Sequence, residues 1–339
     1  MRGPTGRPLP RPAFLAALLL ATTLAACTAP PQALPPTPWP PEATQPPLTT
    51  AVEGDGAAAA CAPRPERVLI VSLDGLTPEA LLAAQAPNLQ ALWQEGAYSW
   101  RAQTVLPSVT LPAHASMLSG LDVPRHGIAW NDWLPHRGYL QAPTAFTLAR
   151  GQGLKVAAFV GKDKLRHLAP PGSTDHFQVA GYRARDIVPR ALDYLLRERP
   201  QLLFLHLPDP DSAGHAWGWG SPAQLQAVAE ADAALGLLFD GLRQAGLWQG
   251  TLVIVTADHG GHDRVHGSAD PRDTTIPWLI YGPGVRRGLE LQGPVRVYDT
   301  APTALWALGL PLPEGWDGRP VLEALEPALA PCPAVAPSP

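Results

Sequence analysis

Five continuous apolar, β-rich runs constrain what this 339-residue chain can fold into. They are RVLIVSL (67–73), KVAAFV (155–160), QLLFLHL (201–207), TLVIVTA (251–257) and IPWLIYG (276–282). A strand with one face in water alternates apolar and polar residues, whereas a strand buried on both faces is apolar throughout. The five runs therefore predict buried, parallel strands.

Helical segments lie between these runs. The clearest begins at Ser221-Pro222, where serine suits the N-cap and proline the first helical position, and it continues with apolar residues at helical spacing as far as Leu242. Alternating strands and helices predict an α/β fold in which a mostly parallel central sheet has helices on both faces.

The N-terminal part of the chain has the composition of a targeting segment. Residues 1–27 combine three arginines with a short apolar stretch, and this stretch is shorter than the roughly 20 residues that span a bilayer. The segment is typical of an export signal. Its last residues, LAAC (24–27), resemble the bacterial lipobox and predict lipidation of Cys27, although a plain cleaved signal with an incidental cysteine is the alternative.

The composition also divides the rest of the chain. Residues 28–63 are rich in proline and alanine and predict a tether, residues 64–328 are long enough for one α/β domain, and a Pro-rich tail occupies 329–339. Cys61 and Cys332 bracket the domain. An oxidising compartment would permit a disulfide between them, and two free thiols are the alternative.

The charge of the chain bears on its partners. The signal carries three arginines and no acidic residue, so its removal changes the formal net charge from -4 to about -7, which is -4 minus 3. No basic patch points to nucleic acid. We expect an exported protein of the cell envelope that meets the membrane only through a lipid anchor at Cys27.

Acidic and histidine side chains follow three of the predicted strands. Asp74 follows the first, Asp211 and His215 follow the run 201–207, and Asp258 and His259 follow the run 251–257. Any one of them could be a loop-capping aspartate or a solvated histidine, but ligands of open α/β sheets bind beyond the carboxyl ends of the strands. Carboxylates mixed with imidazoles suit zinc, whereas calcium prefers oxygen ligands alone. With one more histidine the set is large enough for two ions, as in the centres that assist phosphoryl displacement.

The segment LPSVTLPAHASMLSG (106–120) offers a nucleophile for such a centre. Thr110 lies where an irregular stretch gives way to a predicted helix, so its backbone N–H and the helix dipole would face an incoming anion. Its hydroxyl would need activation by a metal or a base. The alternative is that Ser108 or Thr110 only caps the helix.

The motifs together resemble a known family. SLDG, PSVTLPAHASMLSGLDVPRHGIAWN, PDSAGHAWG, TADHGGH and HGS followed by TTIPWLIYGPGV occur in the order found in type I phosphodiesterases/nucleotide pyrophosphatases of the alkaline phosphatase superfamily, from Val68 to about Pro311. The resemblance implies an alkaline-phosphatase-like fold and two divalent metal ions, for which the residue types favour zinc. It implies that one ion is held by Asp74, Thr110, Asp258 and His259, and the other by Asp211, His215 and His266.

The resemblance also implies a reaction. Thr110 would attack a phosphodiester or nucleotide pyrophosphate bond of a small substrate and form a phosphothreonine intermediate, which water then hydrolyses. Asn131 would bind a phosphate oxygen. Asp209 lies two residues before the matched Asp211 and is not expected to be a ligand.

The stretch TADHGGHDRVHG (256–267) offers three candidates for the last ligand, His262, Asp263 and His266. His266 opens the segment that returns to the next strand and must pass the site, and the resemblance also points to His266. We therefore expect His262 to lie behind the ligands or on the substrate rim, and Asp263 to be solvated.

Three other functions are alternatives to this reaction. Sulfatases of the same superfamily have Cys or Ser followed by x-Pro-x-Arg, but this chain has Thr110-Leu-Pro-Ala-His114. A phosphomonoesterase or phosphonate hydrolase is the main alternative, because the same two-metal centre serves both. A non-catalytic lipoprotein that binds an envelope partner, with metals that only stabilise the fold, is a third, but structural zinc sites are typically Cys-rich.

Four tryptophans near the motifs could line a base or lipid pocket or simply pack: Trp130, Trp133, Trp217 and Trp219.

Overall fold

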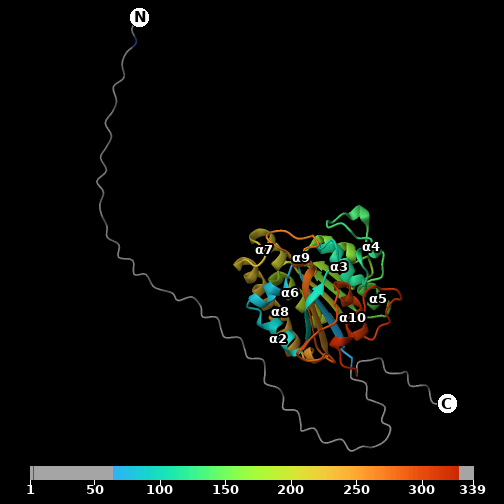
Figure 1. The fold of residues 1–339 in the computed structure, drawn as a ribbon. Helices are drawn as coiled ribbons and strands as arrows, with labels where there is room; N and C mark the ends of the chain where they lie inside the picture. The colour runs from blue at the N-terminus through green and yellow to red at the C-terminus, as the bar shows by residue number, and fades with distance from the viewer. Residues whose placement is uncertain (1–2, 4–63, 328–339) are drawn as a thin grey trace, which may run out of the picture. The chain divides into compact units, whose positions relative to one another are not determined.

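One eight-stranded sheet organises the folded part of the chain (Figure 1). The structure is a computed structural model that describes Gly3 and residues 64–327. The predicted signal (1–27), with its lipobox Cys27, and the tether (28–63) therefore lie outside the described residues, Gly3 apart. So do the tail (329–339) and both members of the Cys61–Cys332 pair.

All five predicted runs form strands. The sheet consists of β1 (Arg67–Leu73), β2 (Ala97–Gln103), β3 (Val156–Val160), β4 (His176–Val179), β5 (Leu202–Leu207), β6 (Thr251–Thr256), β7 (Thr275–Tyr281) and β8 (Leu289–Glu290). The spatial order is β4-β3-β5-β1-β6-β7-β2-β8. β1 lies between β5 and β6 and is parallel to both, with Ile70 opposite Phe204 and Ile254. The mostly parallel central sheet is confirmed.

The direction predicted for the run 276–282 is wrong. β7 is antiparallel to β6, with Ile254 opposite Ile280. Parallel strands need a crossover connection, usually a helix, but only the four-residue helix α9 (Pro271–Thr274) lies between β6 and β7. β7 is apolar because it is buried, with Trp278 fully enclosed. An apolar run therefore indicates burial and leaves strand direction open.

The apolar runs did not predict three of the strands: β2, β4 and β8. β2 alternates buried and partly exposed residues along AYSWRAQ, and every residue of β4 is partly exposed. β4 and β8 are the two edges of the sheet. Strands near an edge lack the continuous apolar character that identifies the central strands.

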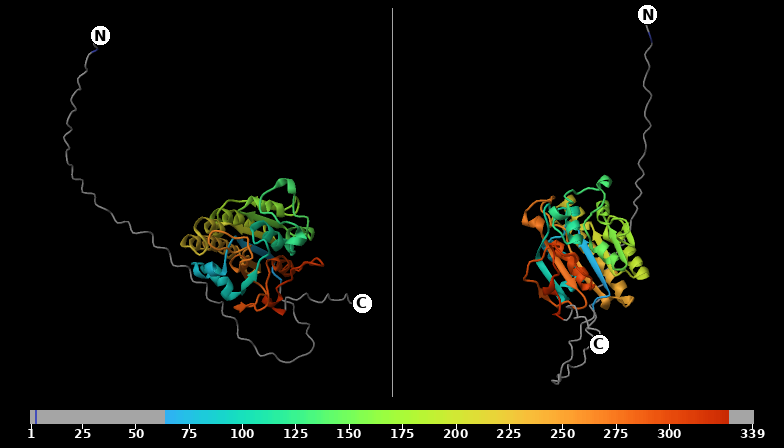
Figure 2. Two further views of the ribbon diagram at one scale, coloured as in Figure 1. Left: turned by 45° about the horizontal axis from the view of Figure 1, so that its top comes forward. Right: turned by 90° about the vertical axis from the view of Figure 1, so that its right-hand side faces the viewer.

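Helices cover both faces of the sheet (Figures 1 and 2). On one face α1 (Pro78–Ala83), α2 (Pro87–Glu95), α6 (Ala184–Glu198) and α7 (Asp209–Trp217) contact the long helix α8 (Pro222–Gln244). On the other, α3 (Thr110–Ser119), α5 (Ala145–Gly151) and α10 (Thr300–Ala307) contact one another, and α4 (Val123–His126) adjoins α3. The predicted start of α8 is confirmed, since Ser221 caps it by accepting from the Gln224 N–H. Within residues 64–327 no helix combines the length and apolar character that a membrane span requires.

A buried carboxylate joins two of these helices. Asp232 of α8 accepts the backbone N–H groups of Leu89 (2.7 Å) and Asn88 (3.2 Å) in the first turn of α2. The N-cap of α2, Ala86, makes no capping hydrogen bond of its own. Asp232 therefore satisfies backbone donors that would otherwise be buried without a partner.

Replacement of Asp232 by alanine should lower the free energy of unfolding by about 2 kcal/mol, because two backbone donors in the first turn of α2 lose their acceptor. Urea denaturation followed by circular dichroism would measure the change. Asp240→Ala is the matched control on the same helix, where the carboxylate is largely exposed and pairs with Arg243. Equal losses in the two variants would contradict the capping role.

Candidate active site

The polar side chains that follow three neighbouring strands meet at one end of the sheet. Asp74 follows β1 directly, and Asp258 lies two residues beyond β6. Asp211 and His215 belong to α7, which begins two residues after β5. Because β5 and β6 flank β1, the three strand ends bring these side chains together, as expected for an open parallel sheet.

Asp74, Asp258 and His259 form the first cluster. Nε2 of His259 is 3.4 Å from Oδ1 of Asp74 and 3.4 Å from Oδ2 of Asp258, and all three side chains are fully buried. Burial by itself would lower the pKa of His259, but Asp258 and Asp74 together raise it to about 9. The first cluster is therefore a strongly anionic environment that attracts a cation.

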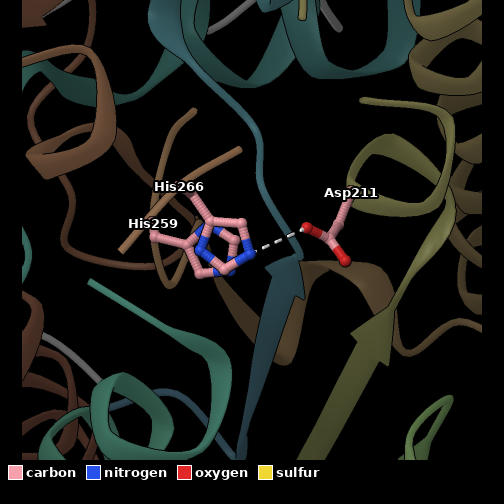
Figure 3. A group of neighbouring side chains, drawn as sticks. All are labelled: Asp211, His259 and His266. Carbon is pink, nitrogen blue, oxygen red and sulfur yellow. Dashed lines mark ion pairs between the residues drawn. The ribbon is translucent and has the colours of Figure 1, made fainter. Parts of the chain in front are cut away.

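Asp211, His215 and His266 form the second cluster. Oδ1 of Asp211 is 3.3 Å from Nε2 of His215 and 3.6 Å from Nε2 of His266. The His266 ring stacks on that of His259, with centroids 3.7 Å apart and planes 9° from parallel. Figure 3 shows these two stacked rings facing the Asp211 carboxylate. His259 thus connects the two clusters, which form one continuous site.

The three histidines are held in one orientation by backbone carbonyls. Their Nδ1 atoms contact carbonyl oxygens, as follows: His215 with Arg264 (3.0 Å), His259 with Gly260 (2.8 Å) and His266 with Ser108 (2.9 Å). A carbonyl only accepts, so in each ring Nδ1 carries a proton and donates it, which leaves Nε2 as the atom directed at the clusters. Histidines that ligate metals are commonly oriented in this way.

The buried polar atoms of the site fit divalent cations. Four of them have no hydrogen-bond partner: Asp74 Oδ1, Asp211 Oδ1, Asp258 Oδ2 and His259 Nε2. Buried polar atoms are normally satisfied, and these four are carboxylate oxygens and an imidazole nitrogen, the donors that zinc accepts. Within the described residues two groups have ligand atoms close enough to share an ion, namely Asp211 with His259 and His266, and Asp74 with Asp258 and His259. The donor set therefore suits metal ions at two adjoining positions.

Thr110 begins helix α3 beside these clusters. The N-cap of α3 is Val109, which makes no side-chain hydrogen bond, and the Ser108 hydroxyl instead donates to the Ser268 carbonyl (2.7 Å). Neither Ser108 nor Thr110 is thus the capping residue that the alternative interpretation required. The Thr110 hydroxyl accepts from Nζ of Lys162 (3.3 Å), so it faces the site.

Asn131 lies next to this helix start. Its side-chain oxygen accepts the backbone N–H of Leu111 (2.9 Å). The amide of Asn131 is therefore fixed one residue from Thr110, where it can meet a group bound there.

Lys162 and His206 also contact the clusters, and the sequence analysis did not predict either of them as a site residue. Nζ of Lys162 lies 2.7 Å from Oδ2 of both Asp74 and Asp211. Nε2 of His206 donates to Oδ2 of Asp74 (2.7 Å), while its Nδ1 accepts the Gly161 N–H (3.1 Å). Burial would raise the pKa of Asp74, but Lys162, His206 and His259 hold it well below its usual range.

A signal for both was present in the sequence. Lys162 comes two residues after the run 155–160, so it follows a strand as the other site residues do. His206 is the one ionisable residue in the run 201–207. A charged or polar group in a fully buried strand needs a partner.

His262, the remaining histidine of the stretch 256–267, lies outside the two clusters. Nδ1 of His262 contacts Oδ1 of the buried Asp273 (2.7 Å), which also accepts from Ser268. Asp263 is exposed, with φ of 48°. Asp209 caps α6 by accepting the Ala184 N–H (2.8 Å). His262 and Asp209 thus hold backbone segments near the site.

Comparison with known proteins identifies the family. A family model described as type I phosphodiesterase / nucleotide pyrophosphatase matches residues 68–266. An uncharacterized pyrophosphatase/phosphodiesterase of Schizosaccharomyces pombe is 26% identical over 62% of this chain and 47% of its own length. Ectonucleotide pyrophosphatase/phosphodiesterase family member 3 of Bos taurus is 27% identical over 65% of this chain and 28% of its own length. The chain thus spans half or less of the length of these relatives.

Solved structures share the fold. Murine ectonucleotide pyrophosphatase/phosphodiesterase 5 superposes with a TM-score of 0.64 at 18% identity, covering 77% of this chain and 100% of that chain. A phosphonate monoester hydrolase from Silicibacter pomeroyi gives a TM-score of 0.57 at 21% identity, covering 76% of each chain. At such identities the likeness shows the alkaline-phosphatase-like fold alone. From the family match, this chain belongs to the type I phosphodiesterase / nucleotide pyrophosphatase family of hydrolytic enzymes.

Proposed function

We propose that this protein is a two-metal hydrolase of phosphodiester or nucleotide pyrophosphate bonds that acts through a covalent phosphothreonine at Thr110. The observation that carries the proposal is the set of four buried ligand atoms without hydrogen-bond partners, gathered beside the first residue of a helix. Membership of the family supports the reaction class. A small phosphate ester is the substrate, and nucleic acid is not expected as a partner.

Seven residues would hold the ions. Asp74, Thr110, Asp258 and His259 would bind one, and Asp211, His215 and His266 the other. Zinc suits this mixture of carboxylates and imidazoles. Bound divalent ions would lower the pKa of the Thr110 hydroxyl and offset charge on the attacking and leaving oxygens.

The residues of the chain would do the rest of the chemistry. Thr110 Oγ1 loses its proton and bonds to phosphorus, the ester P–O bond breaks, and the leaving oxygen takes up a proton. Water then attacks phosphorus, the bond to Thr110 Oγ1 breaks, and the hydroxyl regains its proton. The Asn131 amide and the N-terminus of α3 would bind the phosphoryl oxygens, and one such donor contributes on the order of 3 kcal/mol in comparable oxyanion sites.

Alternative functions differ in what they require of the site. A sulfatase needs a Cys or Ser nucleophile, and this chain has Thr110. A non-catalytic lipoprotein needs no hydroxyl among its metal ligands. Here the Thr110 hydroxyl contacts Lys162, which in turn contacts Asp74 and Asp211. A phosphomonoesterase or phosphonate hydrolase would use the same residues and is therefore the second candidate function. The charge around the phosphoryl group would distinguish it from a phosphodiesterase.

The place of action follows from the sequence features already described. We propose an exported envelope protein that is lipid-anchored at Cys27. The export signal supports it, and relatives carry names of ectonucleotide enzymes.

The zinc-loaded protein should hydrolyse bis(p-nitrophenyl) phosphate or a dinucleotide pyrophosphate, since the clusters are suited to two cations. Dialysis against a chelator should abolish turnover, and added zinc should restore it. Nitrophenolate absorbance and metal analysis would follow the two quantities. Full activity in protein shown to contain no metal would refute the proposal.

Thr110→Ala should abolish turnover because no oxygen remains to attack phosphorus, while circular dichroism should show an unchanged fold. Thr110→Ser should retain part of the rate, since a hydroxyl survives. Acid-quench mass spectrometry of the wild-type protein should detect one phosphorylated Thr110 during turnover. Wild-type rates in the alanine variant would show that Thr110 is not the nucleophile.

His266→Ala should lose about one zinc equivalent per chain and most of the activity, because one ion loses a ligand. His262→Ala is the matched control, since its ring contacts Asp273, and it should keep both equivalents. Atomic emission spectroscopy would count the metal. Loss of zinc in the His262 variant alone would reverse the assignment.

A further inference from the structure

Lysine is rare in this chain and concentrated at one place. The sequence contains three lysines, Lys155, Lys162 and Lys164, among 25 lysine and arginine residues. Lys155 forms an ion pair with Glu198 on the surface (3.0 Å). The other two lie just after β3, at the start of the 3-10 helix η2 (Asp163–Leu168). A lysine ammonium is a compact charge on a flexible stem, unlike the planar guanidinium that the chain uses nearly everywhere else.

The Lys162 ammonium lies between the two clusters and the Thr110 hydroxyl. Its nitrogen is 2.7 Å from Asp74 Oδ2, 2.7 Å from Asp211 Oδ2 and 3.3 Å from Thr110 Oγ1. An ammonium has three donors, and each has an acceptor here. Among the described residues, Lys162 therefore provides the cationic group that contacts the Thr110 hydroxyl, the proposed nucleophile.

The backbone fixes the position from which Lys162 extends. The N–H of Gly161 donates to His206 (3.1 Å). A Cβ at Gly161 would lie 2.5 Å from the ring of Pro208, so the chain passes close to the end of β5 at this point. The other ring nitrogen of His206 donates to Asp74. His206 therefore fixes both the backbone next to Lys162 and a carboxylate of the first cluster.

Lys162 and Lys164 also line one pocket. Its volume is about 410 Å³, and it includes Trp133, Tyr182 and Ser212 among its walls. Lys162 thus reaches Thr110 on one side and this pocket on the other. An anionic group attached to Thr110 and extending into the pocket would meet both ammonium groups.

The charges of the site distinguish two classes of substrate. Three carboxylates, Asp74, Asp211 and Asp258, offset most of the charge of two divalent ions, and the remaining single positive charge matches the single negative charge of a phosphodiester. Lys162 and Lys164 add two positive charges. A terminal phosphate group carries about two negative charges near neutral pH, one more than a phosphodiester, so it balances more of this added positive charge.

We propose that Lys162 and Lys164 bind the non-bridging oxygens of the phosphoryl group, so that this site also hydrolyses phosphomonoesters. The inference rests on the proposed function, because it uses the same nucleophile. When phosphorus is bonded to Thr110 Oγ1, its outer oxygens lie within reach of an ammonium that already contacts Oγ1. Thr110 displaces the alcohol, which leaves with a proton, and water then releases inorganic phosphate; both lysines stay protonated.

The test compares monoester with diester in the zinc-loaded protein. Lys162→Gln and Lys164→Gln should each lower kcat/KM for p-nitrophenyl phosphate about ten- to hundredfold more than for bis(p-nitrophenyl) phosphate, as expected for one lost charge-assisted hydrogen bond. Calorimetric titration with inorganic phosphate should show its Kd weakened by a similar factor. Zinc content should stay at the wild-type value, and Lys155→Gln should behave as wild type.

Three results would overturn the inference. The first is a wild-type protein that hydrolyses the diester and not the monoester. The second is an equal loss on both substrates with phosphate affinity unchanged, which would make Lys162 only a support for Asp74 and Asp211. The third is loss of zinc in the Lys162 variant together with unaltered monoester turnover in Lys164→Gln. Failure of the wild type on every phosphate ester would instead refute the proposed function itself.

Discussion

Three buried carboxylates at one end of the sheet are the constraint on which the rest of the site depends. Asp74, Asp211 and Asp258 are almost fully enclosed, and burying like charges together is costly unless cations balance them. Lys162 and His259 supply part of that balance. The carboxylate oxygens that remain without hydrogen bonds are those available to metal ions.

The antiparallel return of β7 builds the other half of the site. Because only the four-residue helix α9 lies between β6 and β7, residues 257–274 stay at the carboxyl end of the sheet and bring His259 and His266 to the clusters. This segment is joined to the start of α3 twice, through His266 with the Ser108 carbonyl and through the Ser108 hydroxyl with Ser268. The position of Thr110 is thereby coupled to the segment that carries His259 and His266, the histidines proposed as metal ligands.

A few groups around the candidate active site, and not the fold, would determine which phosphate ester is bound. Murine ectonucleotide pyrophosphatase/phosphodiesterase 5 and the phosphonate monoester hydrolase of Silicibacter pomeroyi share the architecture although their names describe different reactions, as expected when a function depends on a site and a fold serves many functions. In this chain the distinguishing groups are Lys162, which contacts Thr110, and Lys164, which lines the same pocket as Lys162. Charge near the phosphoryl group, more than the sheet or its helices, would decide between one and two negative charges on the substrate.

The sequence alone determined the central strands, the start of α8 and the residues expected at the metal centre, because burial, capping and short motifs are local properties. Asp74, Asp211 and Asp258 could be grouped because each follows an apolar run. The direction of β7, the edge strands and the contacts of Lys162 and His206 depended on the tertiary structure. β3, β5 and β1 are neighbours in space in an order that differs from the order in the chain, and this order sets Lys162 against Asp74 and Thr110. A sequence shows which segments are buried, whereas strand pairing is a long-range choice made by packing the whole sheet.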